Sequence, residues 1–248
     1  MQKNNQKLLV SVVITTKNEQ EKIGQCLNSV ASQSYPKESI EVIVVDNDSE
    51  DKTKEIAKEF TDKVFSEGPE RSSQRNFGMK AAAGEYLLYL DADMSLSSEV
   101  ISECVQKCES QGYVGLYIPE KIKGKGFWVK VRDFERSFYD ATCIDAVRFI
   151  NRAAALDIGG FVEELTGPED WDFNRRISEV GNLGITGAVL YHDEGNFNLK
   201  KYIEKKCYYA KSFDAYCSKW GNNDSLTKKQ LGIGYRLFGV FTEAGKWK

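Results

Sequence analysis

Continuous apolar, β-branched runs are the feature that most limits how this chain can fold. Leu8–Thr16 (LLVSVVITT) and Ile40–Val45 consist mainly of such residues, which is typical of strands buried on both faces. Tyr86–Leu90 is a third run, and Lys63–Phe65 is a short one. Because helical patterns separate these runs, the sequence predicts right-handed βαβ units and an α/β fold with a mostly parallel central sheet flanked by helices.

Helical spacing of apolar residues marks the segments around those strands. The predicted helices are Glu19–Ser32, Glu50–Phe60, Arg71–Ala83, Trp128–Asp140, Pro168–Val180 and Lys200–Trp220. Two further apolar runs, Cys143–Ile150 and Ile185–Leu190, predict strands. The helix at Lys200–Trp220 is rich in aromatic and basic residues, so we expect a C-terminal helical extension that differs from the rest of the chain.

Charge is distributed unevenly, although the net charge is only −3. Residues 199–248 carry 11 Lys/Arg and 4 Asp/Glu, a net charge of +7, so residues 1–198 carry −10. The near-neutral total gives no support to nucleic-acid binding. The basic tail indicates contact with an anionic group, such as phospholipid head groups or phosphates, or else a helix whose lysines face water.

Cysteine usage and the N-terminus bear on location. Six cysteines are present without a Cys-x-x-Cys pair, and the chain has one histidine, which argues against a structural zinc site. The first residues are polar and lack the apolar core of a signal peptide. We therefore expect reduced thiols and a cytoplasmic location, peripheral on the cytoplasmic membrane face if the basic tail binds lipid.

Polar clusters follow three of the predicted strands. They are Lys17-Asn18-Glu19, Asp46–Ser49 and Asp91-Ala92-Asp93. In open α/β sheets, ligands bind beyond the carboxyl ends of parallel strands. The sequence therefore predicts that these clusters meet at one sheet edge and form a binding cleft there.

Asp91 and Asp93 present two carboxylates directly after a buried strand. A hard divalent cation such as Mg²⁺ or Mn²⁺ can bind to one or two carboxylates while a substrate diphosphate completes its coordination. Such a cation neutralises charge on a leaving diphosphate. The structural alternative is an aspartate-rich turn in which Asp93 caps the next helix.

Glu169, Asp170 and Asp172 lie in the first turn of the helix predicted to begin at Pro168. The helix dipole stabilises negative charge there, so we expect Asp170 to be ionised at neutral pH. A carboxylate in that state suits a base that takes a proton from an acceptor hydroxyl. The structural alternative is ordinary charge complementarity at a helix N-terminus.

Three other sites remain open from the residues alone. Asp46 lies in a strand-to-helix turn, where it can contact a base or ribose or stabilise the turn. Arg75 can pair with a phosphate or form a surface salt bridge. His192, the single histidine, follows the strand predicted at Ile185–Leu190 and is either a metal or diphosphate contact or a structural residue.

The ordered set of motifs resembles the family 2 glycosyltransferases, which have the GT-A fold. The matching stretches are Val12–Glu19, Val44–Ser49 with Thr53, Gln74–Gly78 with Ala82–Tyr86, Asp91–Asp93, Gly159–Phe161 and Pro168–Asp172. They stand in the family's order and spacing. One departure is that many relatives carry Asp-Asp-Gly-Ser where this chain has Asp46-Asn47-Asp48-Ser49.

The resemblance implies a metal-dependent enzyme of the hexosyltransferase type that uses a nucleotide-diphosphate sugar, with UDP favoured and GDP as the second choice. The donor-binding residues it implies are Thr15, Glu19, Asp46, Arg75 and Asp91. It also implies that Asp93 and His192 bind Mg²⁺ or Mn²⁺. Asp170 would be the base of a single displacement that inverts the anomeric carbon, and Glu169 would orient the acceptor.

The resemblance also implies a division of the chain. Residues 1–195 would form the GT-A catalytic domain, with a nucleotide-binding half at 8–118 and an acceptor-side half at 119–195. Residues 196–248 would form the basic, aromatic extension, which looks like that of relatives working at membranes. Its lysines and tyrosines can anchor at an anionic head-group surface near a glycan or lipid-linked acceptor, or the tyrosines can pack on the catalytic domain.

Two other classes of function compete with this one. A nucleotidyltransferase would need a glycine-rich phosphate loop after the first strand, and Thr15–Glu19 contains no glycine. A non-catalytic module that binds nucleotide sugars would not need a metal-binding Asp93 and a base at Asp170. Slow metal-dependent hydrolysis of a nucleotide sugar would separate an enzyme from such a module.

Overall fold

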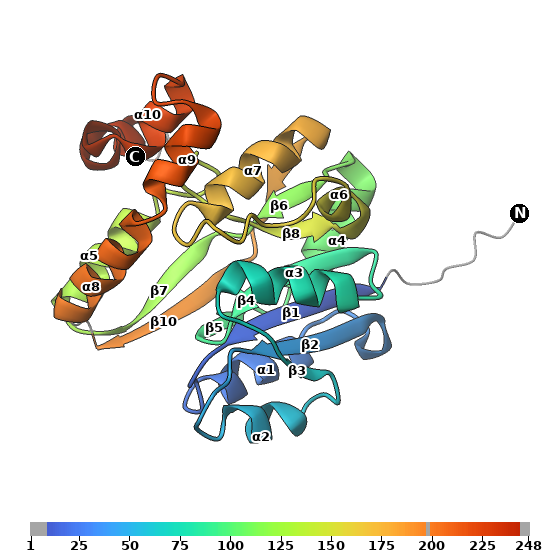
Figure 1. Ribbon diagram of the computed structural model, residues 1–248. Helices are drawn as coiled ribbons and strands as arrows, with labels where there is room; N and C mark the ends of the chain where they lie inside the picture. Colours follow the sequence, from blue (N-terminus) through green and yellow to red (C-terminus); the bar gives the residue numbers. More distant parts are fainter. Residues whose placement is uncertain (1–8, 197–198, 244–248) are drawn as a thin grey trace, which may run out of the picture.

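The computed structural model describes residues 9–196 and 199–243. A twisted sheet of seven strands forms its centre, and Figure 1 shows its arrangement. The strand order is β3-β2-β1-β4-β8-β6-β9. The strands are β1 (Val10–Thr16), β2 (Ile40–Asp46), β3 (Val64–Ser66), β4 (Tyr86–Asp91), β6 (Gly115–Tyr117), β8 (Val147–Asn151) and β9 (Leu183–Ile185). Since β8 alone of these described strands is antiparallel to its neighbours, the prediction of a mostly parallel sheet is confirmed.

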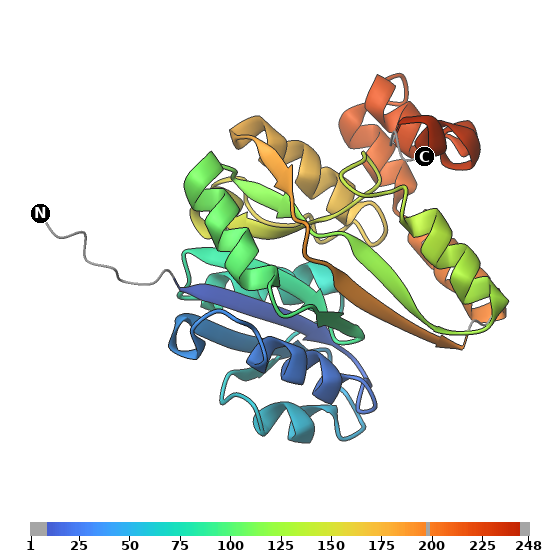
Figure 2. The same ribbon diagram turned by 180° about the vertical axis from the view of Figure 1, so that it is seen from behind.

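Helices cover both faces of this sheet (Figures 1 and 2). One face packs against α1 (Ile23–Ala31), α2 (Thr53–Lys58) and α4 (Val100–Gln111), and the other against α3 (Arg71–Ala81), α6 (Arg152–Asp157) and α7 (Glu169–Val180). Every residue of β1 is buried. Val12 belongs to one hydrophobic cluster and its neighbour Val13 to the other, which explains why the strand is apolar throughout.

A second sheet extends from the carboxyl end of β4. It contains β5 (Met94–Leu96), β10 (Leu190–Asn196) and β7 (Glu120–Lys125), in the order β5-β10-β7. Strand β10 is antiparallel to β5 and parallel to β7, with His192 opposite both Met94 and Ile122. The residues between β4 and β5 therefore lie where the two sheets meet.

The remaining helices follow the smaller sheet and the end of the chain. They are α5 (Phe127–Arg136), α8 (Leu199–Ala210), α9 (Phe213–Trp220), α10 (Ser225–Leu231) and α11 (Val240–Glu243), with a 3₁₀ turn at Lys37–Ser39 and a π-helical turn at Tyr235–Gly239. A third hydrophobic cluster joins Trp171 of α7 to Tyr216 and Val240. The C-terminal helices thus pack on the helix that begins at Glu169, and the domain boundary at residue 195 stays a prediction.

Two predicted elements differ from the structure. The helix predicted at Lys200–Trp220 is divided into α8 and α9, because the chain turns at Ser212, whose hydroxyl accepts the Thr166 N–H at 3.1 Å. Of the strand predicted at Ile185–Leu190, only the two end residues belong to strands. Residues 186–189 form a turn between β9 and β10, where Glu103 accepts two backbone N–H groups. His192 consequently lies inside β10 and not after a strand.

Throughout residues 9–196 and 199–243, every helix is too short or too polar to cross a bilayer.

Candidate active site

A cavity of about 400 Å³ opens at the carboxyl ends of β1 and β4. It brings together five of the predicted site residues, namely Thr15, Glu19, Asp91, Asp93 and His192. Its other walls come from Thr16, Lys17, Asn47, Pro69, Glu70, Arg71, Gln74, Ala92, Lys205, Tyr208 and Tyr209. The polar clusters that follow the strands therefore meet in space, as expected for this sheet topology.

Asp91 lies at the floor of the cavity among three arginines. Its carboxylate is 3.2 Å from Arg75, 3.5 Å from Arg71 and 3.9 Å from Arg148, and it accepts the Thr15 hydroxyl at 3.0 Å. Burial raises the pKa of Asp91, but the guanidinium groups outweigh it and hold the pKa well below its ordinary value. Asp91 is therefore a fixed anion whose charge is already balanced by the protein.

The same arginines connect Asp91 to the first turn of α7. Arg75, whose side chain is 1% exposed, donates to Asp170 at 2.8 Å, and Arg71 donates to Glu169 at 3.1 Å. Arg71 and Arg75 are one helical turn apart on α3, so both can face the cavity floor. The Asp170 side chain is 25% exposed, and the Arg75 guanidinium group links it to Asp91. Asp170 does not itself line the cavity.

Glu169 differs from Asp170 in being buried. Burial raises the pKa of Glu169, and the neighbouring Asp170 carboxylate raises it further. Its Oε2 atom is buried and has no hydrogen-bond partner within the described chain. Asp170 is thus the more accessible of the two carboxylates at this helix N-terminus.

Asp93, His192 and Glu120 form a chain of contacts at the other end of the cavity. His192 Nε2 is 3.1 Å from Asp93 Oδ2, and His192 Nδ1 is 2.9 Å from Glu120 Oε1. Burial lowers the pKa of His192, but the hydrogen bonds to the two carboxylates outweigh it and raise the pKa to about 10. Glu120 thereby fixes the orientation of the imidazole ring toward Asp93.

These residues fit a divalent cation. Asp93 Oδ1 is buried and finds no hydrogen-bond partner in the parts of the chain that the structure describes, so a carboxylate oxygen is left for another ligand. The described residues contain no group of three or more His, Cys, Asp and Glu side chains that could hold a metal by themselves. Asp93 offers one ligand and His192 a second once a cation displaces its Nε2 proton, and a cation there would need further oxygens from a diphosphate or water.

Of the two predicted donor-binding residues Asp46 and Glu19, only Glu19 lines the cavity. Asp46 is fully buried, outside the cavity lining, and accepts the backbone N–H of Ser49 at 2.7 Å. It therefore orders the turn that presents Asn47 to the cavity, while direct donor contact by Asp46 stays a prediction. Glu19 does line the cavity, and burial raises its pKa, followed by the effect of the Asp93 carboxylate.

Several residues of the site carried no role in the sequence-based reasoning. They are Arg71, Glu120 and Arg148. An arginine inside the apolar run Cys143–Ile150 is a pattern that could have indicated Arg148, because a buried strand rarely carries an unpaired charge. Glu120 has no comparable indication, since it lies 72 residues from His192 in the sequence.

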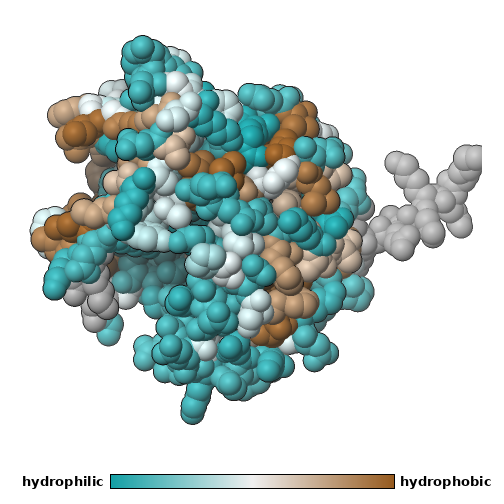
Figure 3. Space-filling view, viewed as in Figure 1, coloured by the Kyte–Doolittle hydropathy of each residue, from teal (hydrophilic) through white to brown (hydrophobic). Residues whose placement is uncertain are grey.

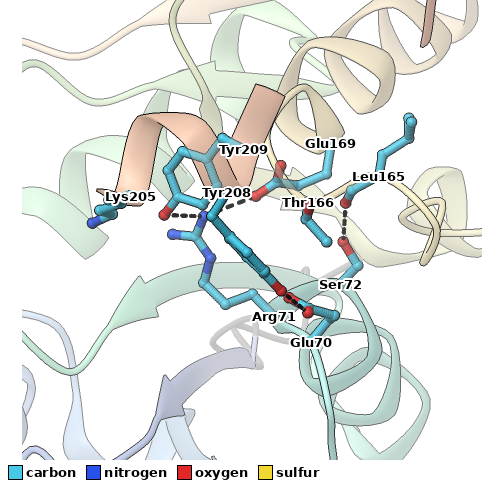
Figure 4. A pocket seen from close by; sticks show the side chains of 9 residues that line it. All are labelled: Glu70, Arg71, Ser72, Leu165, Thr166, Glu169, Lys205, Tyr208 and Tyr209. Carbon is cyan, nitrogen blue, oxygen red and sulfur yellow. Dashed lines mark hydrogen bonds and ion pairs between the residues drawn. The ribbon is translucent and has the colours of Figure 1, made fainter. Parts of the chain in front are cut away.

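Helix α8 closes one side of the site. A smaller cavity of about 160 Å³ adjoins the first and shares Glu70, Arg71, Lys205, Tyr208 and Tyr209 with it (Figure 4). Arg71 donates to the Tyr209 hydroxyl at 3.1 Å, and the Tyr208 hydroxyl donates to Glu70. These two tyrosines of the extension therefore pack on the catalytic domain.

Solved structures share this architecture. TarS 1–349 of Staphylococcus aureus in complex with UDP-GlcNAc superposes with a TM-score of 0.70 and 21% identity, covering 97% of this chain and 76% of that one. The mannosyltransferase PcManGT of Pyrobaculum calidifontis, in complex with GDP-Man and Mn²⁺, gives 0.70 and 19%, covering 97% and 74%. The fold is the GT-A fold of glycosyltransferases.

Sequence comparison shows the family to which the chain belongs. Residues 11–161 match the family described as Glycosyl transferase family 2, and the chain belongs to that family. The glycosyltransferase AglE of Haloferax volcanii is 40% identical over 188 residues, which is 69% of this chain and 62% of AglE. The chain thus spans somewhat less than two thirds of the length of that relative.

Proposed function

We propose that this chain is an inverting, metal-dependent hexosyltransferase that moves a sugar from a nucleotide-diphosphate sugar to an acceptor hydroxyl or lipid-linked phosphate in glycan or cell-envelope synthesis. The observation that carries the proposal is the arginine bridge from Asp91 to Asp170 beside the open carboxylate oxygen of Asp93. This arrangement supports donor binding at one end of the cleft and proton transfer at the other.

The donor would lie along the cavity floor. Thr15, Glu19 and the turn ordered by Asp46 would hold the nucleoside, and Arg75 would hold Asp91 toward the ribose or donor sugar. A UDP-sugar is favoured, and the UDP-GlcNAc bound to TarS supports this choice. A GDP-sugar is the second candidate, supported by the GDP-Man bound to PcManGT.

The roles of the catalytic residues follow from charge. When bound by Asp93 and His192, Mg²⁺ or Mn²⁺ would supply positive charge for the leaving diphosphate, and the Mn²⁺ bound to PcManGT supports that assignment. Asp170 would accept the proton of an acceptor hydroxyl as its oxygen bonds to the anomeric carbon. The bond from that carbon to the diphosphate breaks on the opposite side, its electron pair leaves with the diphosphate, and the configuration inverts.

The two halves of the catalytic domain would divide these tasks. Residues 8–118 would supply the nucleotide contacts, and residues 119–195 would supply Asp170, His192 and Glu169, which would orient the acceptor. Arg75 donates to Asp170 at 2.8 Å and would hold its carboxylate in place before the acceptor arrives. The proposed location is cytoplasmic, because that compartment supplies nucleotide sugars and keeps cysteine thiols reduced.

A thermal-shift screen tests the proposal directly. UDP- and GDP-sugars should raise the unfolding midpoint with Mg²⁺ or Mn²⁺ and much less with EDTA, because a ligand that binds the native state stabilises it by mass action. Release of nucleoside diphosphate without acceptor then separates an enzyme from a binding module. No stabilisation by any of these donors with either metal would reject the proposal.

A further inference from the structure

Helix α5 is attached to the protein by its more polar side. Val129 is the buried residue of this 10-residue helix. Asp133 accepts the backbone N–H of Ile122 in β7 at 2.8 Å, and Arg136 contacts Glu120 at 3.1 Å. Polar contacts and one valine thus hold α5 against the smaller sheet.

The strongly apolar side of α5 faces outward. Phe127, Val131 and Phe134 recur at helical spacing on one stripe, with Trp128 beside it, and the exposed fractions are 70% for Phe127, 58% for Trp128 and 55% for Phe134. Helices of globular proteins normally turn such a stripe toward the core. An exposed stripe of this kind indicates an interaction surface.

This stripe continues onto neighbouring elements. The Phe134 ring lies 6.4 Å from that of Phe241, in the segment that also exposes Leu237 and Phe238. Among the described residues, ten of the thirteen exposed large hydrophobic side chains lie on α5, α8 and residues 233–238. Hydrophobic side chains accordingly gather at the left edge of Figure 3, where Figure 1 places these elements.

Four lysines lie next to the exposed stripe in the sequence, three on β7 and one on α5. Residues 121–131 contain Lys121, Lys123, Lys125 and Lys130 and no carboxylate. All four are exposed, and within the described chain none of them is recorded in an ion pair. This charge is complementary to an anionic surface. A second copy of the chain would bring two such lysine groups together, which like-charge repulsion opposes.

We propose that α5 docks this protein on an anionic bilayer. Phe127 and Trp128 enter the boundary between head groups and acyl chains, the lysines contact lipid phosphates, and the short helix lies in the membrane plane. Strand β7, next to α5, pairs with β10, which carries His192, so docking places the cleft at the lipid surface. The proposal does not require the transferase activity, because docking uses neither donor nor base.

Vesicle flotation tests this docking. The wild-type protein should float with vesicles of phosphatidylcholine and phosphatidylglycerol, and binding should decrease with salt and with phosphatidylcholine alone. Phe127→Ser with Trp128→Ser should weaken vesicle binding by about tenfold or more, because two apolar side chains leave the inserted face. Leu156→Ser with Val180→Ser, at exposed apolar positions on α6 and α7, is the matched control and should bind like wild type.

Two further measurements make the test decisive. Brominated lipid should quench the fluorescence of Trp128, and Trp128→Phe should still float while losing that quenching. Donor hydrolysis should be unchanged in the Phe127→Ser, Trp128→Ser variant, which separates docking from catalysis. Failure of the wild type to bind anionic vesicles, or unaltered binding by the serine variant, overturns the proposal. Self-association abolished by those serines, without vesicle binding, overturns it in favour of a dimer interface.

Discussion

The two ends of the cleft balance their carboxylates in different ways. At one end, Asp91, Glu169 and Asp170 contact Arg71 and Arg75, so the protein itself supplies the opposing charge. At the other end, Asp93 has one histidine contact and one buried oxygen without a partner in the described residues. At the first end arginines of the protein hold the carboxylates, although Glu169 Oε2 also lacks a partner there within the described chain. At the second end Asp93 lines the larger cavity, and its free oxygen is open to a ligand that the described residues do not provide.

This difference assigns different demands to the two ends. Arginine side chains belong to the chain and stay charged. They therefore hold Asp170, the proposed base, and Asp91 in position before substrate arrives. A cation can arrive with the diphosphate and leave with it, so the end at Asp93 can change its charge during turnover. Variants should therefore separate turnover, at the arginine end, from metal-dependent donor binding, at the Asp93 end.

Asp170→Asn should have the largest effect. It removes the proton acceptor and keeps an oxygen for Arg75, so turnover with a hydroxyl acceptor should fall by about 10²–10⁴-fold while donor affinity stays near that of wild type. Single-turnover assays and calorimetry with the donor measure the two quantities. Asp157→Asn, on the exposed end of α6, is the control. A loss of turnover smaller than tenfold would contradict the assignment of Asp170 as base.

Asp93→Ala should act at the opposite end. Donor affinity in the presence of Mn²⁺ should fall by about 100-fold, because a metal-bound diphosphate loses several kcal/mol of charge stabilisation. In calorimetry, the affinity of the Asp93→Ala variant for UDP should be similar with Mn²⁺ and with EDTA. The wild-type protein should bind UDP more tightly with Mn²⁺. Asp62→Ala, at an exposed position, should keep the wild-type difference between the two conditions. If Asp170→Asn and Asp93→Ala lost donor equally, the contrast between the two ends would be wrong.

The strands and carboxylates of the arginine-paired end were predictable from the sequence, whereas the contacts of Arg71 and Arg148 were not. The apolar runs locate β1, β2 and β4, because each of their apolar residues packs into a core on one face or the other. Parallel topology then brings the strand-end clusters to one edge, which places Thr15, Glu19 and Asp91 together. The helix that starts at Pro168 follows from its proline and its carboxylates.

The smaller sheet and the direction of α5 were not predictable in the same way. Strand β7 lies in a segment rich in lysine and glycine, and pairing with β10 determines its structure more than any local preference does. That distant pairing also creates the contact from Glu120 to His192. The sequence shows an apolar stripe on α5 but contains nothing that says whether the stripe faces the core or solvent.

Glu120→Gln tests whether Glu120 supports His192 as a metal ligand at the Asp93 end. The amide no longer holds the His192 ring as a charged acceptor, so metal affinity should fall by about 10–100-fold, as for other partners of metal-binding histidines. Turnover at saturating Mn²⁺ should fall much less. Metal titration followed by donor hydrolysis separates these effects, with the unfolding midpoint as a check, because Glu120 also contacts Arg136. Glu135→Gln, on α5, is the control, and an unchanged metal requirement in Glu120→Gln would argue against His192 as a ligand.

Tyr209→Phe should give the smallest effect and tests whether α8 tunes the arginine end. The substitution removes the hydroxyl that accepts from Arg71, leaving the Arg71 contacts to Asp91 and Glu169 in place. One hydrogen bond contributes about 0.5–1.5 kcal/mol, so the donor KM should rise by about two- to tenfold while kcat is nearly unchanged. Steady-state kinetics at saturating Mn²⁺ measures both, and Tyr113→Phe, outside the cavity lining, is the matched control. A fall in kcat with unchanged KM would mean that α8 acts on the first turn of α7, which carries the proposed base, because Arg71 also contacts Glu169 there.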